Sequence, residues 1–466
     1  MRVGAIVLGL VATLLATRSA TAAGNVTFVD AAGITVTASA RLDDRQYDVS
    51  VYSPALDRIV HVRVLLPADY DPAGPALPVL YLFHGTSGRA SDWVNAGGAV
   101  QATAGLPLIV VMPDAGFDGN GGGWFTNWVN PNTPLGPSQW ETFHVGQLIP
   151  WVDANLRTIA ARSGRAIAGL SQGGFGSTTY AARHPELFVS VASFSGAPAI
   201  DADPVVAAGA TGIIEATTVG LDRVAPSAMF GSRATNEINW QGHDPSTLVT
   251  NLRGMDVWLW TASGVPGELD SGPPNPSAMA IEGATHRSTM SFVQRADQLG
   301  VPVHLVDYGA GTHSWPYWAR DLREYLVPLM QDFATTPALP ATVSFRSVDR
   351  TWSQWGWTVS FTRSAALEHS SIEGASSGGF TLRGTGTALV TTPAVYVPGA
   401  TYDVRLSGAS GARSAVAVAG SDGRLQLTVP MRTPIGVAVA APPAVVGQPD
   451  LVPLPTTYVT IIRRAA

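Results

Sequence analysis

The chain has 466 residues and a net charge of −6 at neutral pH; the length allows two domains, and the acidic balance argues against nucleic acid as a partner. It contains no cysteine, which excludes disulfides, thiolate metal sites and a cysteine nucleophile. All of its basic residues are arginine, which we interpret as the codon bias of a high-GC bacterial genome. No metal-ligand spacing is present, so we expect neither a metal nor another cofactor.

The N-terminal residues 1–23 resemble a secretory signal peptide. Arg2 provides the basic start, residues 3–16 form an apolar core, and the small residues 20–22 form a cleavage site. A membrane anchor is the alternative, but the apolar run is shorter than the ~20 residues that a span needs. We expect no later stretch to be long and apolar enough to cross a bilayer, and we expect a secreted or cell-envelope protein.

Residues 24–336 alternate between strand and helix patterns. Antiparallel strands are predicted first, followed by short apolar runs typical of strands buried on both faces. The predicted strands are 47–52, 59–66, 79–83, 108–112, 165–170, 188–194, 255–260 and 301–306, and the predicted helices are 90–104, 147–161, 175–184, 277–299 and 316–333. This order predicts an α/β fold with a mostly parallel central sheet flanked by helices. Residues 205–251 are the best candidate for a cap-like insertion.

A proline-containing linker is predicted at residues 337–342, and the periodicity changes after it. Residues 343–466 contain short alternating strands separated by Gly, Ser, Asp and Pro turns, which predicts an all-β, sandwich-like C-terminal domain. Trp352, Trp355 and Trp357 are candidates for a sugar-binding platform, although tryptophan at alternating strand positions is more typical of a core.

The pattern Gly169-x-Ser171-x-Gly173 is typical of a nucleophile elbow, in which a strand turns sharply into a helix and exposes a serine. Glycine is needed on both sides, since larger side chains would collide at the bend. The flanking residues predict a strand before the serine and a helix after it. We therefore predict Ser171 as a nucleophile.

A serine nucleophile requires a base, an acid and donors for the oxyanion. His313 lies in a Gly-rich loop directly after the last predicted strand and is the candidate base. The acid is left open among Glu268, Asp270 and Glu282. The predicted oxyanion donors are the backbone N–H groups of Gln172 and of Thr86, which follows the His84-Gly85 turn.

Four stretches resemble the esterase D / feruloyl esterase branch of the α/β-hydrolases, which includes the secreted mycobacterial mycolyltransferases. They are residues 169–174, 124–128, 140–143 and 311–318, and the resemblance covers residues 58–330. It implies Glu282, in the pair Glu282-Gly283, as the acid, with Asp270 as the alternative. It also supports Thr86 and Gln172 as oxyanion donors.

The same resemblance implies that Trp315 lines the acyl or acceptor site, and we predict His84 and Trp124 as further substrate-binding residues. One departure concerns the oxyanion turn, where mycolyltransferases carry an Asp before the glycine and an Arg soon after it. This chain has His84 and Thr86-Ser87 instead. Because the missing residues help to hold the sugar acceptor in that family, trehalose recognition does not follow from the resemblance.

Three functions follow as hypotheses. The first is a secreted serine esterase that cleaves carboxylic esters through an acyl-enzyme on Ser171. The second is a cell-envelope acyltransferase with a sugar, glycolipid or polymer acceptor. The third is a non-catalytic carbohydrate-binding protein with a decayed hydrolase domain. The expected substrate is a small-molecule or lipid ester.

Overall fold

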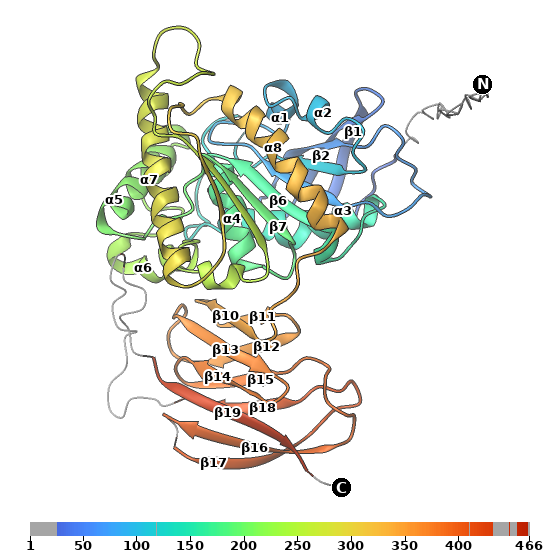
Figure 1. The fold of residues 1–466 in the computed structure, drawn as a ribbon, viewed down its shortest axis with the longest axis vertical. Coiled ribbons are helices and arrows are strands. Elements are labelled where there is room, and N and C mark those ends of the chain that lie inside the picture. Colours follow the sequence, from blue (N-terminus) through green and yellow to red (C-terminus); the bar gives the residue numbers. More distant parts are fainter. Residues whose placement is uncertain (1–25, 118, 410, 432–446, 448–453, 465–466) are drawn as a thin grey trace, which may run out of the picture.

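The computed structural model describes residues 26–431, 447 and 454–464, apart from residues 118 and 410. Figure 1 shows an α/β part that is followed along the chain by an all-β part beneath it. The predicted fold class, an α/β-hydrolase sheet with a C-terminal all-β region, is confirmed. The predicted signal peptide lies outside the described residues.

The α/β part is built on a nine-stranded sheet with the order β1-β2-β3-β5-β4-β6-β7-β8-β9. The first strands pair antiparallel, and the pairs from β5 to β9 are parallel. The strands are β1 Thr35–Arg41, β2 Gln46–Ser53, β3 Arg58–Leu65, β4 Val79–Phe83, β5 Ile109–Pro113, β6 Arg165–Leu170, β7 Ser190–Phe194, β8 Asp256–Thr261 and β9 His304–Asp307. The predicted buried strands are therefore present, with β4 and β6 at the predicted bounds.

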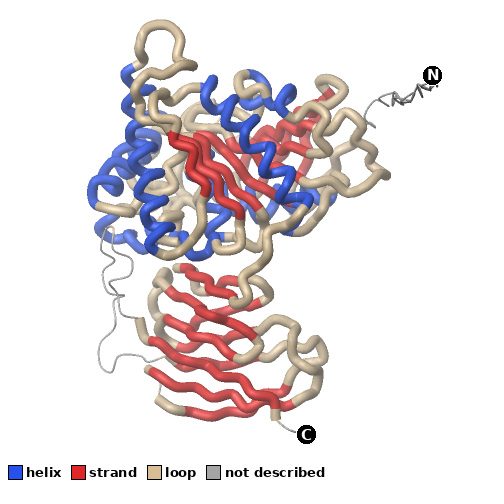
Figure 2. The backbone as a smooth tube through the Cα atoms, in the orientation of Figure 1, coloured by secondary structure: helices blue, strands red, loops and turns tan. Residues whose placement is uncertain are grey.

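Helices cover both faces of this sheet (Figure 2). They are α1 Asp92–Asn95, α2 Ala99–Ala102, α3 Ile149–Asn155, α4 Gln172–Arg183, α5 Pro204–Glu215, α6 Arg233–Gly242, α7 Pro276–Gln298 and α8 Trp315–Ala334. Successive residues of β4 enter two different cores: Tyr81 joins the core that contains Phe175 of α4, whereas Leu82 joins the core that contains Leu322 of α8. A strand buried on both faces is largely apolar, which explains the apolar run of β4.

Two predicted helices differ from the structure. The helix predicted at 90–104 is split into α1 and α2, because Gly98 between them has a φ of 65°. The helix predicted at 147–161 begins earlier, as a π-helical turn over Thr142–Leu148, and ends at Asn155. Leu156 is extended, and the following Thr158 pairs with Leu77 beside the sheet, which stops the helix.

The predicted cap-like insertion at 205–251 is largely helical. It contains most of α5, the π-helical segment Ala216–Leu221, α6 and a 3₁₀ turn at Val249–Leu252. The run Pro204–Leu221 is 18 residues long with a mean hydropathy of 1.3, so by length and composition alone it qualifies as a candidate membrane span. The expectation that no later stretch would meet these two criteria was therefore wrong.

The all-β part contains two antiparallel sheets, with strand orders β10-β13-β14-β19-β16-β17 and β11-β12-β15-β18. Their strands are β10 Val343–Ser347, β11 Thr351–Gln354, β12 Trp357–Thr362, β13 Ser370–Ser376, β14 Gly379–Arg383, β15 Thr387–Thr391, β16 Thr401–Gly408, β17 Arg413–Val418, β18 Gln426–Pro430 and β19 Thr456–Arg463. Trp352 and Trp357 are buried in the core of this part. They cannot form an exposed sugar platform, and the core interpretation is correct for both.

The two parts are joined by polar contacts. The Arg183 guanidinium at the end of α4 pairs with Asp349 at 3.2 Å, and the Gln241 side chain hydrogen-bonds His369 at 2.8 Å. Asn251 exchanges two hydrogen bonds of 2.8 Å with the backbone of Arg346. These contacts link the all-β part to the end of α4, to α6 and to the turn at Val249–Leu252.

Candidate active site

Ser171 occupies a strained backbone position between β6 and α4. Its φ of 52° and ψ of −122° lie in a backbone region that residues other than glycine rarely adopt. A Cβ on Gly169 would lie 2.4 Å from the Gly173 carbonyl oxygen, and a Cβ on Gly173 would lie 2.4 Å from the His84 carbonyl oxygen. Both glycines are therefore required by close backbone approach, as the elbow pattern predicts.

His313 and Glu282 form a buried pair. His313 Nδ1 lies 2.7 Å from Glu282 Oε2, and the Glu282 side chain is 0% exposed. Glu282 Oε1 accepts two more hydrogen bonds of 2.9 Å, from Ser195 Oγ and from the Ala262 N–H. These donors follow β7, β8 and β9, so three strand ends converge on one carboxylate. A buried carboxylate is costly unless it is hydrogen-bonded, and the three donors offset that cost.

The second ring nitrogen of His313 is unoccupied. Nε2 is buried, and no atom in the described part of the chain makes a hydrogen bond to it. The ring is held edge-on against Trp318, with centroids 4.9 Å apart. The Ser171 N–H donates to the Phe194 carbonyl at 2.9 Å, and the next residue, Ser195, binds Glu282. Ser171, Glu282 and His313 thus belong to the same edge of the sheet.

The oxyanion turn packs directly against the elbow. A Cβ on Gly85 would lie 3.1 Å from Ser171 Cβ, which is a tight contact and shows how closely the turn approaches the elbow. Gln172 Nε2 donates to Thr86 Oγ1 at 3.1 Å, which links the two predicted donor residues. Gln172 is the first residue of α4, where a backbone N–H has no partner within the helix. Within the described residues neither the Thr86 nor the Gln172 N–H has an acceptor.

His84 does not fit its predicted role as a substrate contact. Its side chain is buried, and its Nδ1–H donates to the Gly85 carbonyl at 2.7 Å. Its Nε2 accepts from the Ala115 N–H at 2.8 Å. Both ring nitrogens are therefore used by the backbone, which also assigns the proton to Nδ1. The ring instead fixes the turn that precedes Thr86.

Trp124 and Trp315, the two tryptophans predicted to contact substrate, differ in solvent exposure. Trp124 is 4% exposed and packs on Phe175 of α4 at 5.6 Å between centroids, so it lies mainly behind the elbow. Trp315 is half-buried and packs edge-on against Trp93 at 5.4 Å and Trp318 at 5.3 Å. Because Trp318 also contacts the His313 ring, Trp315 is the predicted substrate residue that stays close to the site and partly open.

Asp270, the alternative acid, does not contact His313. It accepts hydrogen bonds from the Thr312 hydroxyl, from the Gly267 N–H at 2.8 Å and from Tyr317 Oη at 3.0 Å. Burial acts to raise the pKa of Asp270, but these donors hold it below its usual value. Asp270 therefore supports the loop that carries His313. Glu268, the third candidate, is 76% exposed and pairs with Arg320.

Two buried polar residues had no role in the sequence prediction: Ser195 at the site and Glu141 at the far end of α4. Ser195, which binds Glu282, has a φ of 48° at the end of β7 and is buried. Glu141 is also buried and accepts from Arg183 Nε at 2.7 Å and His184 Nε2 at 2.8 Å. Burial acts to raise the pKa of Glu141, but the charge of Arg183 and the His184 bond hold it well below its usual range. Glu141 therefore fixes the end of α4. The sequence signal that could have identified Glu141 was its place in the stretch 140–143, which resembles the family.

No group of three or more His, Asp or Glu side chains able to hold a metal ion occurs among the described residues. The arrangement described above provides instead a serine, a histidine with one open nitrogen, a buried carboxylate and two unpaired N–H groups. These are the parts of a nucleophilic acyl-transfer site.

Two curated relatives share stretches of sequence with the chain. Over 144 residues it is 47% identical to the esterase Rv1288 of Mycobacterium tuberculosis (strain ATCC 25618 / H37Rv), which covers 30% of this chain. The chain spans only 30% of that relative's length. Over 299 residues it is 29% identical to the diacylglycerol acyltransferase/mycolyltransferase Ag85A of the same strain, covering 62% of this chain and 82% of the relative.

Two solved structures resemble part of this chain, and a family model matches it. Mycobacterium tuberculosis MPT51 (FbpC1) gives a TM-score of 0.49 at 25% identity, covering 60% of this chain and 95% of that one. A ferulic acid esterase gives 0.43 at 22% identity, covering 61% and 96%. The model of the Esterase family matches residues 53–328, which is more than half of the sequence. The chain therefore belongs to the Esterase family.

Proposed function

We propose that this protein is a serine esterase that cleaves carboxylic esters through an acyl-enzyme on Ser171. The observation that carries the proposal is the 2.7 Å bond between His313 Nδ1 and the fully buried Glu282, which leaves His313 Nε2 open. The strained Ser171 at the elbow is the nucleophile that this base serves. Membership of the Esterase family supports the same reaction class.

In the first half-reaction, Ser171 Oγ attacks the ester carbonyl carbon while its proton passes to His313 Nε2. The carbonyl π electrons move to the oxygen, and the N–H groups of Thr86 and Gln172 hydrogen-bond the resulting oxyanion. When the tetrahedral intermediate collapses, the C–O bond to the alcohol breaks and the alcohol takes the proton from Nε2. Water then repeats the sequence on the acyl-enzyme and releases the acid and free Ser171.

Glu282 acts on His313 during both steps. Its carboxylate accepts the Nδ1–H, so Nε2 is the nitrogen without a proton and is able to act as the base. Its negative charge then stabilises the imidazolium that forms. The bonds from Ser195 and Ala262 hold the carboxylate in place, so its orientation does not depend on His313 alone.

The proposal is tested with Ser171→Ala and a panel of p-nitrophenyl esters from short to long acyl chains. We expect kcat/KM to fall at least about 10³-fold, because removal of a triad member leaves only binding and oxyanion stabilisation. Ser91→Ala is a matched control, since Ser91 precedes α1 and makes no capping hydrogen bond there. Wild-type turnover by Ser171→Ala, or failure of a fluorophosphonate probe to label the native protein, contradicts the assignment.

The second candidate function is acyl transfer to a sugar or glycolipid acceptor. It is favoured by the 29% identity to Ag85A and by the run of residues 311–318. Hydrolysis is preferred, because His84 stands where that family has an acidic acceptor contact, and its ring nitrogens are both engaged. An acyl-sugar product that increases with polyol concentration at the expense of free acid would favour transfer, and unchanged hydrolysis at high trehalose would favour water.

We also propose export and a two-domain organisation. Cleavage after the predicted signal of residues 1–23 would place the enzyme outside the cell or in its envelope, with a catalytic domain at 24–336, a linker at 337–342 and a β domain at 343–466. N-terminal sequencing of the protein from culture medium and cell fractions tests export. Limited proteolysis tests the linker.

A further inference from the structure

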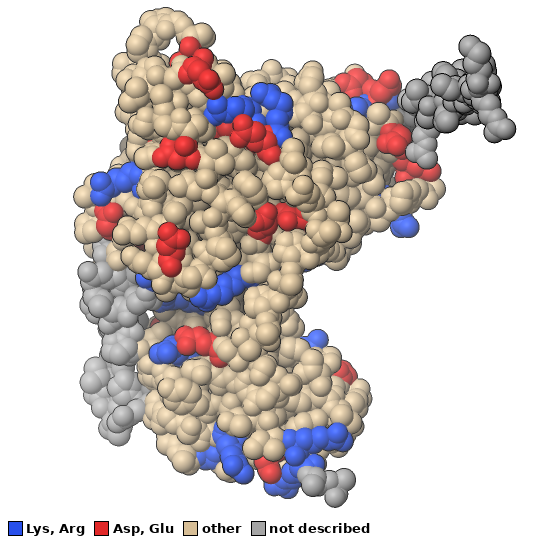
Figure 3. Space-filling model, in the orientation of Figure 1, with Lys and Arg blue, Asp and Glu red and all other residues tan. Residues whose placement is uncertain are grey.

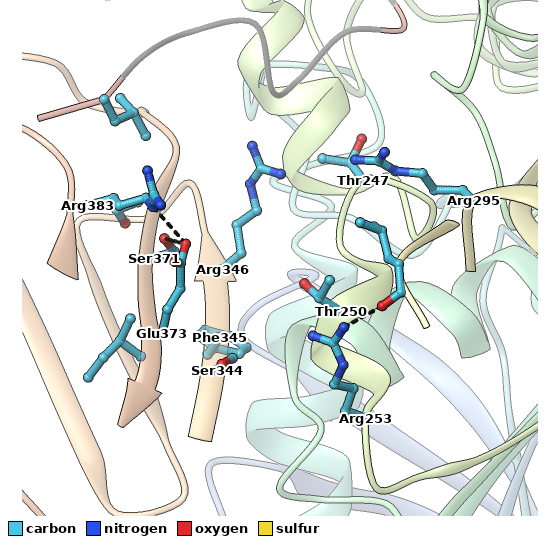
Figure 4. A pocket seen from close by; sticks show the side chains of 14 residues that line it. Thr247, Thr250, Arg253, Arg295, Ser344, Phe345, Arg346, Ser371, Glu373 and Arg383 are labelled. Carbon is cyan, nitrogen blue, oxygen red and sulfur yellow. Dashed lines mark hydrogen bonds and ion pairs between the residues drawn. The ribbon is translucent and has the colours of Figure 1, made fainter. Parts of the chain in front are cut away.

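A cleft of about 480 Å³ lies between the two parts of the molecule, and its lining contains none of Ser171, Glu282 and His313 (Figure 4). Every charged side chain of this lining has a partner within the protein: Arg253, Arg295, Arg346, Glu373 and Arg383. Figure 3 shows basic and acidic surface close together where the two parts meet. The described part of this cleft therefore presents no unused charged group, whereas the turn beside Ser171 presents an unused hydroxyl proton.

That hydroxyl belongs to Thr86, the residue that follows Gly85 in the oxyanion turn. Thr86 is half-buried, and within the described residues its Oγ1 takes part in one hydrogen bond, which it accepts from Gln172 Nε2 at 3.1 Å. A hydroxyl group has one proton to donate and two lone pairs that accept, so the bond from Gln172 leaves the proton free. The proton is available to a group that enters the site.

The Gln172 carboxamide is held in the orientation that keeps this proton free. Gln172 is 2% exposed, and a Cβ on Gly122 would lie 2.2 Å from its Oε1, so the amide packs directly on the Gly122 backbone. The neighbouring Gly121 carbonyl accepts from the Ser87 N–H at 2.7 Å, which ties the same loop to the oxyanion turn. Since the NH₂ group faces Thr86, the amide donates to the hydroxyl and does not compete for its proton.

The Thr86 hydroxyl lies beside the two predicted oxyanion donors. The Thr86 N–H has no acceptor within the described residues, and Oγ1 is only three covalent bonds from that nitrogen. The Gln172 N–H, at the start of α4, is likewise without an acceptor there. The turn is close to the nucleophile, because a Cβ on Gly85 would lie 3.1 Å from Ser171 Cβ. Three donors from two residues are therefore grouped beside Ser171.

We propose that the Thr86 hydroxyl is a third donor to the oxyanion and that the Gln172 side chain positions it. This inference rests on the proposed serine esterase and concerns the same site. The proton stays on Thr86 throughout, so the hydroxyl makes a hydrogen bond and no covalent bond changes at this residue. The hydrogen bond strengthens as negative charge develops on the carbonyl oxygen, so it stabilises the transition state more than the bound substrate. We therefore expect its loss to lower kcat and to leave KM nearly unchanged.

The first test is Thr86→Val, which replaces the hydroxyl by a methyl group of similar size and keeps the backbone N–H. We expect kcat for p-nitrophenyl butyrate to fall about 10- to 100-fold, because two N–H donors remain, and KM to stay within about twofold. Thr86→Ser restores a hydroxyl and should recover kcat to within about threefold of wild type. Thr362→Val is the matched control, since Thr362 is exposed on β12 in the all-β part, and it should keep wild-type kcat.

The second test isolates the positioning role of Gln172. Gln172→Met removes the NH₂ donor and keeps the backbone N–H. It should lower kcat about three- to tenfold in the native protein and leave kcat unchanged in the Thr86→Val background, because no hydroxyl is left there to orient. A trifluoromethyl ketone, which forms an oxyanion on Ser171, should bind each variant more weakly by the same factor as kcat/KM falls. Unchanged melting temperatures verify that the variants are folded.

Retention of kcat within about twofold by Thr86→Val overturns the proposal. A Thr86→Ser variant that is as slow as Thr86→Val also overturns it, because the loss then comes from packing. An equal effect of Gln172→Met in both backgrounds refutes the positioning role. Wild-type turnover by Ser171→Ala removes the proposed function and this inference together, whereas loss of turnover by Ser171→Ala with native kcat in Thr86→Val refutes this inference alone.

Discussion

Replacing Glu282 with Gln exchanges one buried carboxylate oxygen for an NH₂ group and tests the contact between Glu282 and His313. Glu282 Oε2 accepts the Nδ1–H of His313 at 2.7 Å, and Oε1 is already used by Ser195 and Ala262. In the variant, the amide oxygen keeps the two donors at Oε1, and the NH₂ group faces His313. Because that group donates, Nδ1 must accept, and the proton moves to Nε2. The base then holds a proton at the position where it should receive one.

The magnitude follows from two losses. The catalytic tautomer is disfavoured, and the imidazolium loses a charge-assisted hydrogen bond worth about 1.5–3 kcal/mol plus a buried negative charge. We expect kcat to fall about 10³- to 10⁴-fold, which corresponds to about 4–5.5 kcal/mol in the activation free energy. KM should change little, since Glu282 lies behind His313 and does not contact substrate.

The assay is steady-state hydrolysis of a p-nitrophenyl ester, with Asp270→Asn as the matched control. Asp270 touches Thr312 and Tyr317 and not His313, so its variant should lose less than about tenfold in kcat. The far-UV circular dichroism of both variants should match that of the native protein. Retention of kcat within tenfold by Glu282→Gln, or an equally large loss in Asp270→Asn, would refute the assignment of the acid.

Three further predictions concern stability and geometry. Glu141→Gln should lower the free energy of unfolding in urea by about 3–5 kcal/mol because it breaks a buried ion pair, whereas Glu268→Gln, at an exposed pair, should change it little. Burial raises the pKa of Asp222 to about 7, so ionisation of this carboxyl destabilises the fold as pH rises from about 4 through 7. Asp222→Asn should therefore have a higher Tm than wild type at pH 8.5 and the same Tm at pH 4. An increase in Tm of equal size at both pH values would refute this. Gly173→Ala should displace the oxyanion turn, because its Cβ would lie 2.4 Å from the His84 carbonyl oxygen. We expect a large loss of kcat with a small change in Tm, which paired kinetic and melting measurements check.

Much of the fold could be predicted because local patterns were sufficient. The buried run at β4 is apolar at every position and β6 is apolar after Arg165, as a strand covered on both faces requires. The short strands β13 and β14 could not be predicted individually, because Ser and Gly interrupt their alternation and their burial depends on partners far along the chain. The helical insertion at 205–251 was unclear for the same reason, since its Gly/Ala composition gives little periodicity.

In the candidate site, too, some features follow from local sequence and others depend on tertiary packing. The spacing of glycines around Ser171 follows from steric exclusion at a tight bend, so the sequence by itself determines the elbow and the strand and helix beside it. The residues alone left the acid open, because Glu282 and Asp270 both precede His313 at plausible distances along the chain, and only the family resemblance favoured Glu282. The tertiary structure then shows Glu282, and not Asp270, in contact with His313. Convergence of β7, β8 and β9 places three donors on Glu282 and none of them on Asp270. Spatial proximity of residues distant in sequence is a property of packing, and local sequence does not encode it.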